Sequence, residues 1–124
     1  TDLAGYFSHE NKETMIVTHC ENIECLKNLD EICEIPEIDV IFVGPYDMSQ
    51  SLGVTGQVTH DSVENAIQKA LEITKRHGKA CGIFTGSGEA AKKRVEQGFQ
   101  YVAIGLDISL FGAKCRQEIE AFRG

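Results

Sequence analysis

The sequence predicts an α/β fold built on a parallel sheet. Four short runs rich in Val, Ile and Phe alternate with helical patterns along 124 residues, and none of these runs alternates polar with apolar positions. Continuous apolar runs of this length are typical of strands that are buried on both faces, as in parallel sheets. Because strands and helices alternate, neighbouring strands should be parallel and joined by right-handed crossovers. The length is that of one domain, which is enough to bury a sizeable core.

The predicted strands follow one another at regular intervals. They cover residues 15–20 (MIVTHC), 39–43 (DVIFV), 80–84 (ACGIF) and 101–104 (YVAI). The second ends at Gly44-Pro45 and the fourth ends before Gly105.

Helical patterns fill the intervals between these strands. One apolar stripe runs through residues 22–34 and stops shortly before Pro36. The clearest helix follows Asp61, the expected N-cap, with Glu64 at the capping-box position. It ends at His77-Gly78, and its buried stripe should be Val63, Ala66, Ile67, Ala70, Leu71 and Thr74. Further helices are expected over about 89–97 and 109–122, and residues 3–11 look like the tail of an earlier helix or loop.

Composition excludes several classes of protein. A hydrophobic fraction of 42% and a charged fraction of 25% are ordinary for a globular protein and argue against disorder. No apolar run approaches the roughly 18–20 residues of a membrane span, and the chain does not begin with a signal segment. The net charge of −7 argues against a nucleic-acid partner. The five cysteines, at positions 20, 25, 33, 81 and 115, lack C-x-x-C spacing, so we expect reduced thiols and a cytoplasmic protein.

The pattern leaves two architectures open. A small four-stranded open sheet would use all 124 residues. Alternatively, these are the last four units of an eight-unit barrel, which needs about 250 residues. The chain starts in a stub without an initiator methionine, which favours a piece of a larger protein.

Two carboxylates stand at strand ends, where α/β folds bind ligands. Glu21 directly follows the first strand, and Asp47 follows the second after the turn Gly44-Pro45-Tyr46. Neighbouring parallel strands lie about 4.8 Å apart, so the two carboxylates can share a hard divalent ion. The Glu21 carboxylate could instead interact with the dipole at the N-terminus of the helix that follows it. Asp47 could be the N-cap of a helical turn that begins at Met48. In the turn, the N–H groups of Tyr46 and Asp47 could point at a substrate carboxylate.

Several segments resemble a known family. Residues 28–32 (NLDEI), 39–49 (DVIFVGPYDMS) and 51–53 (SLG) are similar to the second half of the HpcH/HpaI aldolases. These are class II, metal-dependent pyruvate aldolases of the citrate-lyase and phosphoenolpyruvate-utilising barrel superfamily. The similarity continues through residues 82–84, 98–99 and 105–107. The resemblance implies that residues 1–124 are units five to eight, the C-terminal half, of a (β/α)8 TIM barrel.

The resemblance also implies a site. His19-Cys20-Glu21, followed by Lys27-Asn28-Leu29, matches the family segment that carries a metal-binding glutamate, which makes Glu21 the first metal ligand. The second ligand is Asp47, in the segment that resembles the family's GPxDLS. His19 stands where the family has a glutamine two residues before the glutamate, and this departure could change how the keto-acid oxygen is held or which metal is preferred. Taken by itself, His19 could equally be a core or hydrogen-bonded histidine.

Binding partners follow from the same resemblance. The metal is expected to be Mg²⁺ or Mn²⁺, with Co²⁺ as a further option. The turn Gly44-Pro45-Tyr46 is expected to bind the carboxylate of a small 2-keto acid.

The implied reaction cleaves a 4-hydroxy-2-keto acid to pyruvate and an aldehyde through a metal-stabilised pyruvate enolate. The family's catalytic histidine and its substrate-binding arginine lie in its first half. His9, His60 and His77 fall in an apparent loop, a turn and a helix end, so we expect no catalytic base in this chain. The chain alone should therefore be inactive, and the whole protein should be a homo-oligomer.

Two alternatives remain from the residues themselves. The chain could be a non-catalytic or truncated half-barrel that binds a divalent metal and self-associates through its unpaired sheet edges. It could also bind phosphate at its glycine-rich turns, residues 85–88 and 105–107.

Overall fold

A four-stranded parallel sheet forms the centre of the computed structural model, which describes residues 3–124 and all their side chains except those of residues 4, 8 and 11. The strands are β1 (Val17–Cys20), β2 (Val40–Val43), β3 (Ala80–Thr85) and β4 (Tyr101–Ile104), and they lie in the order β1-β2-β3-β4. All three neighbouring pairs are parallel. The predicted α/β class and the predicted strands are confirmed.

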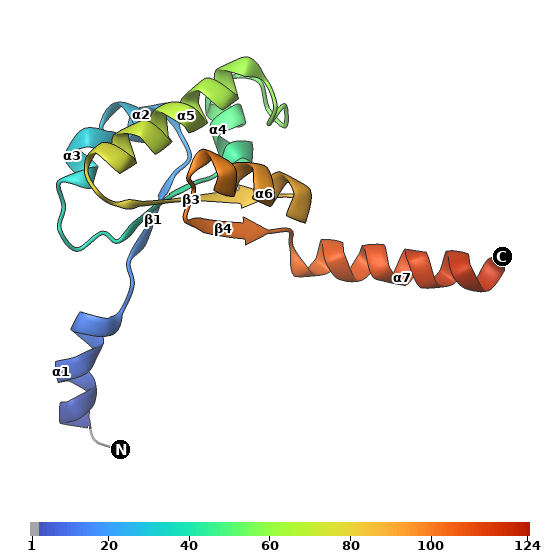
Figure 1. Cartoon of the computed structure of the whole chain (residues 1–124), viewed down its shortest axis with the longest axis horizontal. Coiled ribbons are helices and arrows are strands. Elements are labelled where there is room, and N and C mark those ends of the chain that lie inside the picture. The colour runs from blue at the N-terminus through green and yellow to red at the C-terminus, as the bar shows by residue number, and fades with distance from the viewer. Residues whose placement is uncertain (1–2) are drawn as a thin grey trace.

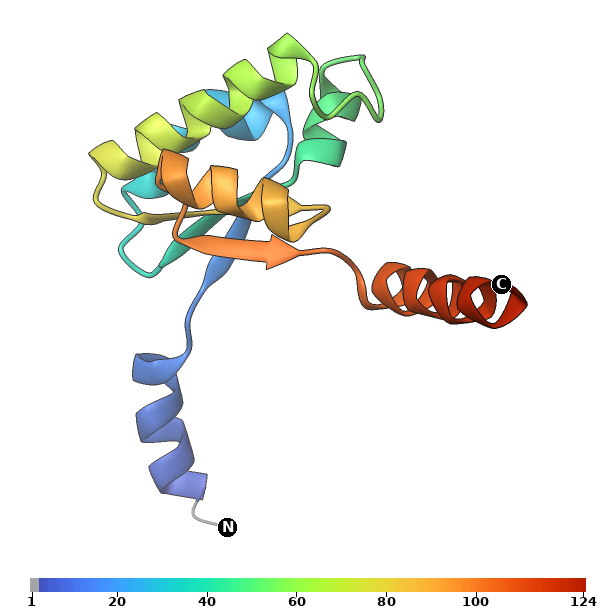
Figure 2. The ribbon, with the colours of Figure 1, turned by 45° about the vertical axis from the view of Figure 1, so that its right-hand side comes forward.

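The helices distinguish between the two architectures that the sequence left open. They are α1 (Leu3–Glu13), α2 (Ile23–Lys27), α3 (Leu29–Cys33), α4 (Pro45–Ser51), α5 (Asp61–Arg76), α6 (Gly88–Gln97) and α7 (Asp107–Arg123). Helices α2 to α6 cover one face of the sheet, whereas α1 and α7 run away from it (Figures 1 and 2). A sheet wound in one direction with its helices on one face has the arrangement of consecutive (β/α)8-barrel units, because a doubly wound sheet reverses its strand order.

The core lies between the sheet and α5. Ile67 of α5 is fully buried and Leu71 is 4% exposed, so the predicted inner face of this helix is correct. Ile41, Cys81 and Ile83 point into the same core from β2 and β3. Burial raises the pKa of the Cys81 thiol to about 11, so this cysteine behaves as a small buried hydrophobe.

Two local predictions were wrong. Residues 22–34 form two short helices, because Asn28 leaves the helical conformation at φ −94° and ψ 7° and its N–H bonds back to Glu24 and Cys25. The N-cap of α5 is His60 rather than Asp61, since the His60 side chain accepts the N–H of Ser62. Asp61 is the first residue of the helix.

The expected capping-box partner, Glu64, makes a long-range ion pair instead. Nη1 and Nη2 of Arg94 in α6 donate to its two carboxylate oxygens, each at 2.7 Å. Arg94, and then Gln68, hold the pKa of Glu64 below its ordinary value of 4.5 against the opposing effect of burial. The pair joins two helices that lie side by side over the sheet (Figure 1).

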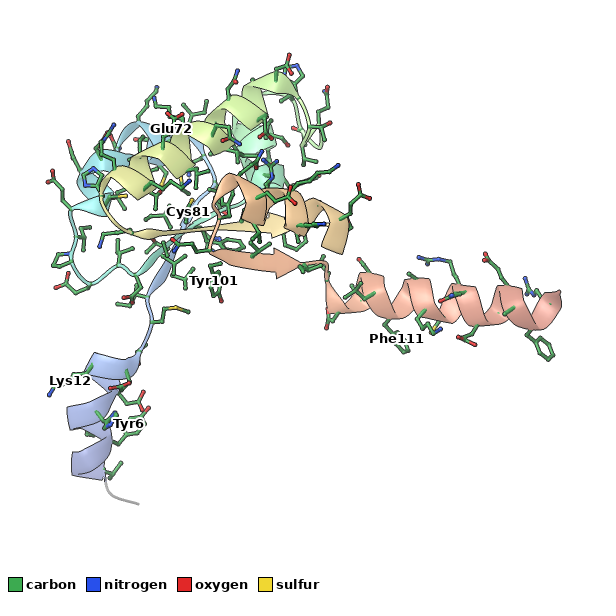
Figure 3. The ribbon with its side chains drawn as sticks, in the orientation of Figure 1. Tyr6, Lys12, Glu72, Cys81, Tyr101 and Phe111 are labelled. Atoms are coloured by element: carbon green, nitrogen blue, oxygen red, sulfur yellow. The ribbon has the colours of Figure 1, made fainter. Side chains whose placement is uncertain are left out.

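Replacing Glu64 with glutamine is expected to lower the melting temperature at pH 7. A carboxyl group whose pKa is lowered by folding adds stability above its unfolded pKa, and this stability is lost as the pH falls through the folded pKa. The difference between wild type and E64Q should therefore be full above pH 4.5 and shrink below it. The control is E72Q, on the outward side of α5 (Figure 3), and an equal effect of both changes at all pH values would contradict the assignment.

The opposite face of the sheet has no helix over it among residues 3–124 (Figure 1). His19, Phe42, Gly82 and Tyr101 occupy one row of the register. Figure 3 shows Tyr101 on this open side and Cys81 on the side of the helices. A Cβ atom at Gly82 would lie 2.8 Å from both Phe42 Cδ2 and the Tyr101 carbonyl oxygen, so glycine is required for the two rings to meet. This face corresponds to the interior of a barrel.

Large apolar side chains on α7 are exposed, including Ile108 at 75% and Phe111 at 73%. Phe111 projects from α7 well away from the sheet (Figure 3).

No helix within residues 3–124 is long and apolar enough to cross a membrane.

Candidate metal and substrate site

The carboxylates of Glu21 and Asp47 converge at the carboxyl end of the sheet. Glu21 directly follows β1, Asp47 lies in the first turn of α4 after β2, and β1 and β2 are hydrogen-bonded neighbours. A methyl group at position 44 would lie 3.2 Å from Glu21 Oε2 and 3.7 Å from Asp47 Oδ2. Because Gly44 has no side chain, the space between the two carboxylates stays open.

Local hydrogen bonds hold the two segments together. The side chain of Asn22 caps α2 by accepting the N–H of Cys25 at 2.8 Å. The N–H of Ile23 donates to the hydroxyl of Ser51, at the end of α4, at 3.0 Å. The loop that carries Glu21 is thereby tied to the helix that carries Asp47.

His19 lies beside Glu21. Its Nδ1 is 3.1 Å from Glu21 Oε2, and its ring packs against Phe42 with centroids 5.3 Å apart. The side chain of His19 is 58% exposed and that of Glu21 is 40% exposed. The histidine therefore belongs to the same site as the two carboxylates.

The turn after β2 presents backbone donors. Gly44 is the N-cap of α4 and Pro45 its first residue, which has no N–H to leave unsatisfied. The N–H groups of Tyr46 and Asp47 lie in the first turn, where no carbonyl of the helix can accept them. Pro45 is buried, whereas Tyr46 is 57% exposed.

Ser49 is a residue of this site whose role the sequence did not reveal. It is fully buried, its hydroxyl donates to the Tyr46 carbonyl at 2.5 Å, and it accepts the N–H of Gly56 at 2.9 Å. The N–H of Val54 also donates to the Ser49 carbonyl. Ser49 thus holds the start of the following loop, at Val54 and Gly56, against the turn. One indication was available: Ser49 lies in a short helix next to Met48, which faces the core. A serine buried there needs a hydrogen-bond partner for its hydroxyl.

Replacing Ser49 with alanine is expected to lower the free energy of unfolding by about 1–3 kcal/mol, because both hydrogen bonds of the buried hydroxyl, to the Tyr46 carbonyl and from the Gly56 N–H, are lost. Urea denaturation measures this loss. The control is S109A, on the exposed surface of α7. A loss no greater than in the control would show that the Ser49 hydrogen bonds add nothing.

A cavity of about 300 Å³ adjoins the turn. Its walls come from the first turn of α4, from residues 58–59, and from the segment around the end of β3 and the start of α6. Local sequence patterns did not indicate it, because its walls come from three separate segments of the chain, within residues 45–46, 58–59 and 84–94.

The other residues considered from sequence have separate structural roles. His60 caps α5, Nε2 of His77 lies 2.8 Å from Asp30 Oδ1, and His9 is exposed near Glu13. In the glycine-rich turn after β3, the hydroxyl of Ser87 caps α6 by accepting the N–H of Ala90.

Within residues 3–124, no three His, Cys, Asp or Glu side chains form a group that could hold a metal ion. The donor set at this position is therefore two carboxylates, and a divalent ion there would take its other ligands from water and substrate, as Mg²⁺ commonly does.

The parallel strand–helix units have the arrangement of consecutive units of a (β/α)8 barrel, a fold whose active sites lie at the carboxyl ends of its strands. The profile of the HpcH/HpaI aldolase/citrate lyase family matches residues 4–113. The chain belongs to this family, as its sequence predicted.

Individual relatives are aldolases. The chain is 34% identical over 122 residues to a hydroxypyruvate/pyruvate aldolase of Pseudomonas aeruginosa, covering 98% of this chain and 46% of that protein. It is 34% identical to a 5-keto-4-deoxy-D-glucarate aldolase of Citrobacter koseri, with 95% and 46% covered. A crystal structure of a family member from Burkholderia cenocepacia superposes with a TM-score of 0.93 at 29% identity, covering 99% of this chain and 48% of the other. The chain thus spans about half the length of these relatives.

Proposed function

We propose that this chain supplies the metal-binding half of a class II aldolase that cleaves 4-hydroxy-2-keto acids to pyruvate and an aldehyde. The observation that carries the proposal is the convergence of Glu21 and Asp47 across Gly44, in a chain of an aldolase family. Aldolases are carbon–carbon lyases, and the strand ends are where barrel enzymes place their catalytic groups.

The two carboxylates fit Mg²⁺ or Mn²⁺, which prefer oxygen ligands and keep positions open for water and substrate. Co²⁺ is compatible with the same donors. When bound, such an ion supplies positive charge next to the keto-acid oxygen on which negative charge develops during cleavage.

The chain's own residues would act as follows. Glu21 and Asp47 hold the ion, and the hydrogen bond from His19 fixes the orientation of the Glu21 carboxylate. The N–H groups of Tyr46 and Asp47 bind the carboxylate of the 2-keto acid, with Gly44 and Pro45 shaping the turn. The base that removes the proton of the 4-hydroxyl group, and an arginine for the substrate, would come from the other half of the barrel.

The test is a fusion of the N-terminal half of the Pseudomonas aeruginosa relative with residues 1–124. The fusion, supplied with Mg²⁺ or Mn²⁺, is expected to release pyruvate from a 4-hydroxy-2-keto acid, and the 124-residue chain alone is not. Size-exclusion chromatography and a cooperative thermal transition establish that the fusion is folded. A folded fusion that binds Mn²⁺ but releases no pyruvate would favour the non-catalytic half-barrel instead.

A further inference from the structure

The cavity beside the candidate site has walls from three parts of the chain. Pro45 and Tyr46, which immediately precede Asp47, form one wall. Val58 lies on the loop that Ser49 anchors, and Phe84 and Ala90 come from β3 and α6. The cavity therefore borders the turn that would bind the keto acid.

The cavity offers no uncompensated charge. Arg94 is the one charged side chain among the described residues that line it. Nη1 and Nη2 of Arg94 donate to Glu64 at 2.7 Å, and Nη1 also donates to Gln97 Oε1 at 3.0 Å. Because Arg94 lowers the pKa of Glu64, the pair remains ionised and neutral overall at pH 7. An anionic group in the cavity would meet an arginine whose charge is already balanced.

The rest of the lining is mainly apolar. Val58, Phe84 and Ala90 present carbon surfaces, and the hydroxyl of Thr85 donates to the Ala103 carbonyl at 2.9 Å. A volume of about 300 Å³ lies at the lower end of the range for small-molecule sites, which is roughly 300–1,000 Å³. The cavity thus has room for an apolar group such as a phenyl ring, since an apolar cavity of about 150 Å³ already holds benzene.

We propose that this cavity binds the aldehyde part of the substrate, and that the substituent of this aldehyde is uncharged and apolar and can be as large as a phenyl ring. The inference rests on the proposed function, because the cavity shares Pro45 and Tyr46 with the turn that would bind the keto acid. It assigns the acceptor to Pro45, Tyr46, Val58, Phe84 and Ala90 of this chain.

The test begins with binding to the 124-residue chain, measured by amide chemical shifts in two-dimensional NMR. The probes are 4-fluorobenzaldehyde, 4-fluorobenzyl alcohol, which cannot form an imine with lysine, and the anionic succinic semialdehyde. Both fluorinated probes are expected to shift the amides of Thr85, Gly86 and Ala90, and succinic semialdehyde is not. Shifts confined to other residues, or binding of succinic semialdehyde as tight as that of the fluorinated probes, would overturn the inference.

Filling the cavity provides the second measurement. Ala90→Leu places a larger side chain in the wall while keeping a strong helix former in α6. It should weaken binding of both fluorinated probes by about tenfold or more, a factor typical of a misfitted apolar pocket. The matched control is Ala121→Leu, on the exposed surface of α7, which should leave binding unchanged. Equal binding by the two variants would count against the cavity.

The fusion protein separates failure of this inference from failure of the proposed function. If the inference holds, Ala90→Leu lowers kcat/KM for a 4-phenyl-4-hydroxy-2-keto acid by about tenfold but not for a substrate whose 4-substituent is hydrogen. If the fusion releases pyruvate from both and Ala90→Leu changes neither, only the present inference is wrong. If a folded fusion releases none from either substrate, the proposed function fails, and the cavity's role as an aldehyde site fails with it.

Discussion

Replacing Asp47 with alanine is expected to weaken Mn²⁺ binding by about 100-fold or more and to abolish metal-dependent pyruvate release by the fusion protein. The change removes one of the two proposed charged ligands, which should cost more than the 10–100-fold typical of losing an outer-shell partner. Mn²⁺ titration followed by electron paramagnetic resonance measures the affinity directly. The control is Asp61→Ala, which removes an exposed carboxylate from the first turn of another helix, α5. Unchanged affinity in D47A would mean that Asp47 is not a metal ligand.

Replacing Gly44 with alanine tests the same site without removing a carboxylate. The backbone at Gly44 has φ −100°, which alanine adopts without strain. Its methyl group, however, would lie 3.2 Å from both Cβ and Oε2 of Glu21, so the Glu21 carboxylate and the backbone that carries it must shift by a few tenths of an ångström. We expect weaker Mn²⁺ binding with nearly unchanged thermal stability. A variant that binds Mn²⁺ as wild type does would show that the space over Gly44 is not where the ion sits.

The sheet could be predicted from sequence because burial on both faces leaves a pattern within each strand. Val40–Val43 is apolar at every position, and in the structure Ile41 and Val43 face the helices while Phe42 faces the open side. The same reasoning located the inner face of α5, since a helix packed on a sheet repeats its buried positions every three to four residues.

The ends of the helices were less predictable because competing partners come from elsewhere in the chain. Asp61 and Glu64 have the spacing of a capping box, but Glu64 pairs with Arg94, which lies 30 residues further along. Nothing local distinguishes a glutamate that caps its own helix from one that binds the next helix. His60 then caps α5 with its ring nitrogen, which is an uncommon choice for this position.

Some parts of the candidate site could likewise be predicted from sequence, and others could not. Glu21 and Asp47 could be brought together from sequence, because each follows a strand and parallel neighbours end at one edge. Ser49 and the cavity could not, because they depend on the path of residues 52–60 and on the approach of Ala90 to the turn. Such contacts join segments that are distant in the chain, and no periodic sequence pattern predicts which distant segments will meet.

Truncating Leu71 to alanine is expected to lower the free energy of unfolding by about 2–5 kcal/mol, as buried leucine truncations do. Leu71 is 4% exposed and lies in the core together with Ile67 and Ile83, so the shortened side chain would leave a cavity that rigid neighbours cannot fill. Domains of this size have a total stability of only about 5–15 kcal/mol, so L71A alone would remove a large share of it. The matched control is Leu110→Ala on α7, where the side chain is 57% exposed and the loss should stay under about 1 kcal/mol. Urea denaturation of both variants decides the point, because equal losses would mean that α5 does not present Leu71 to the sheet.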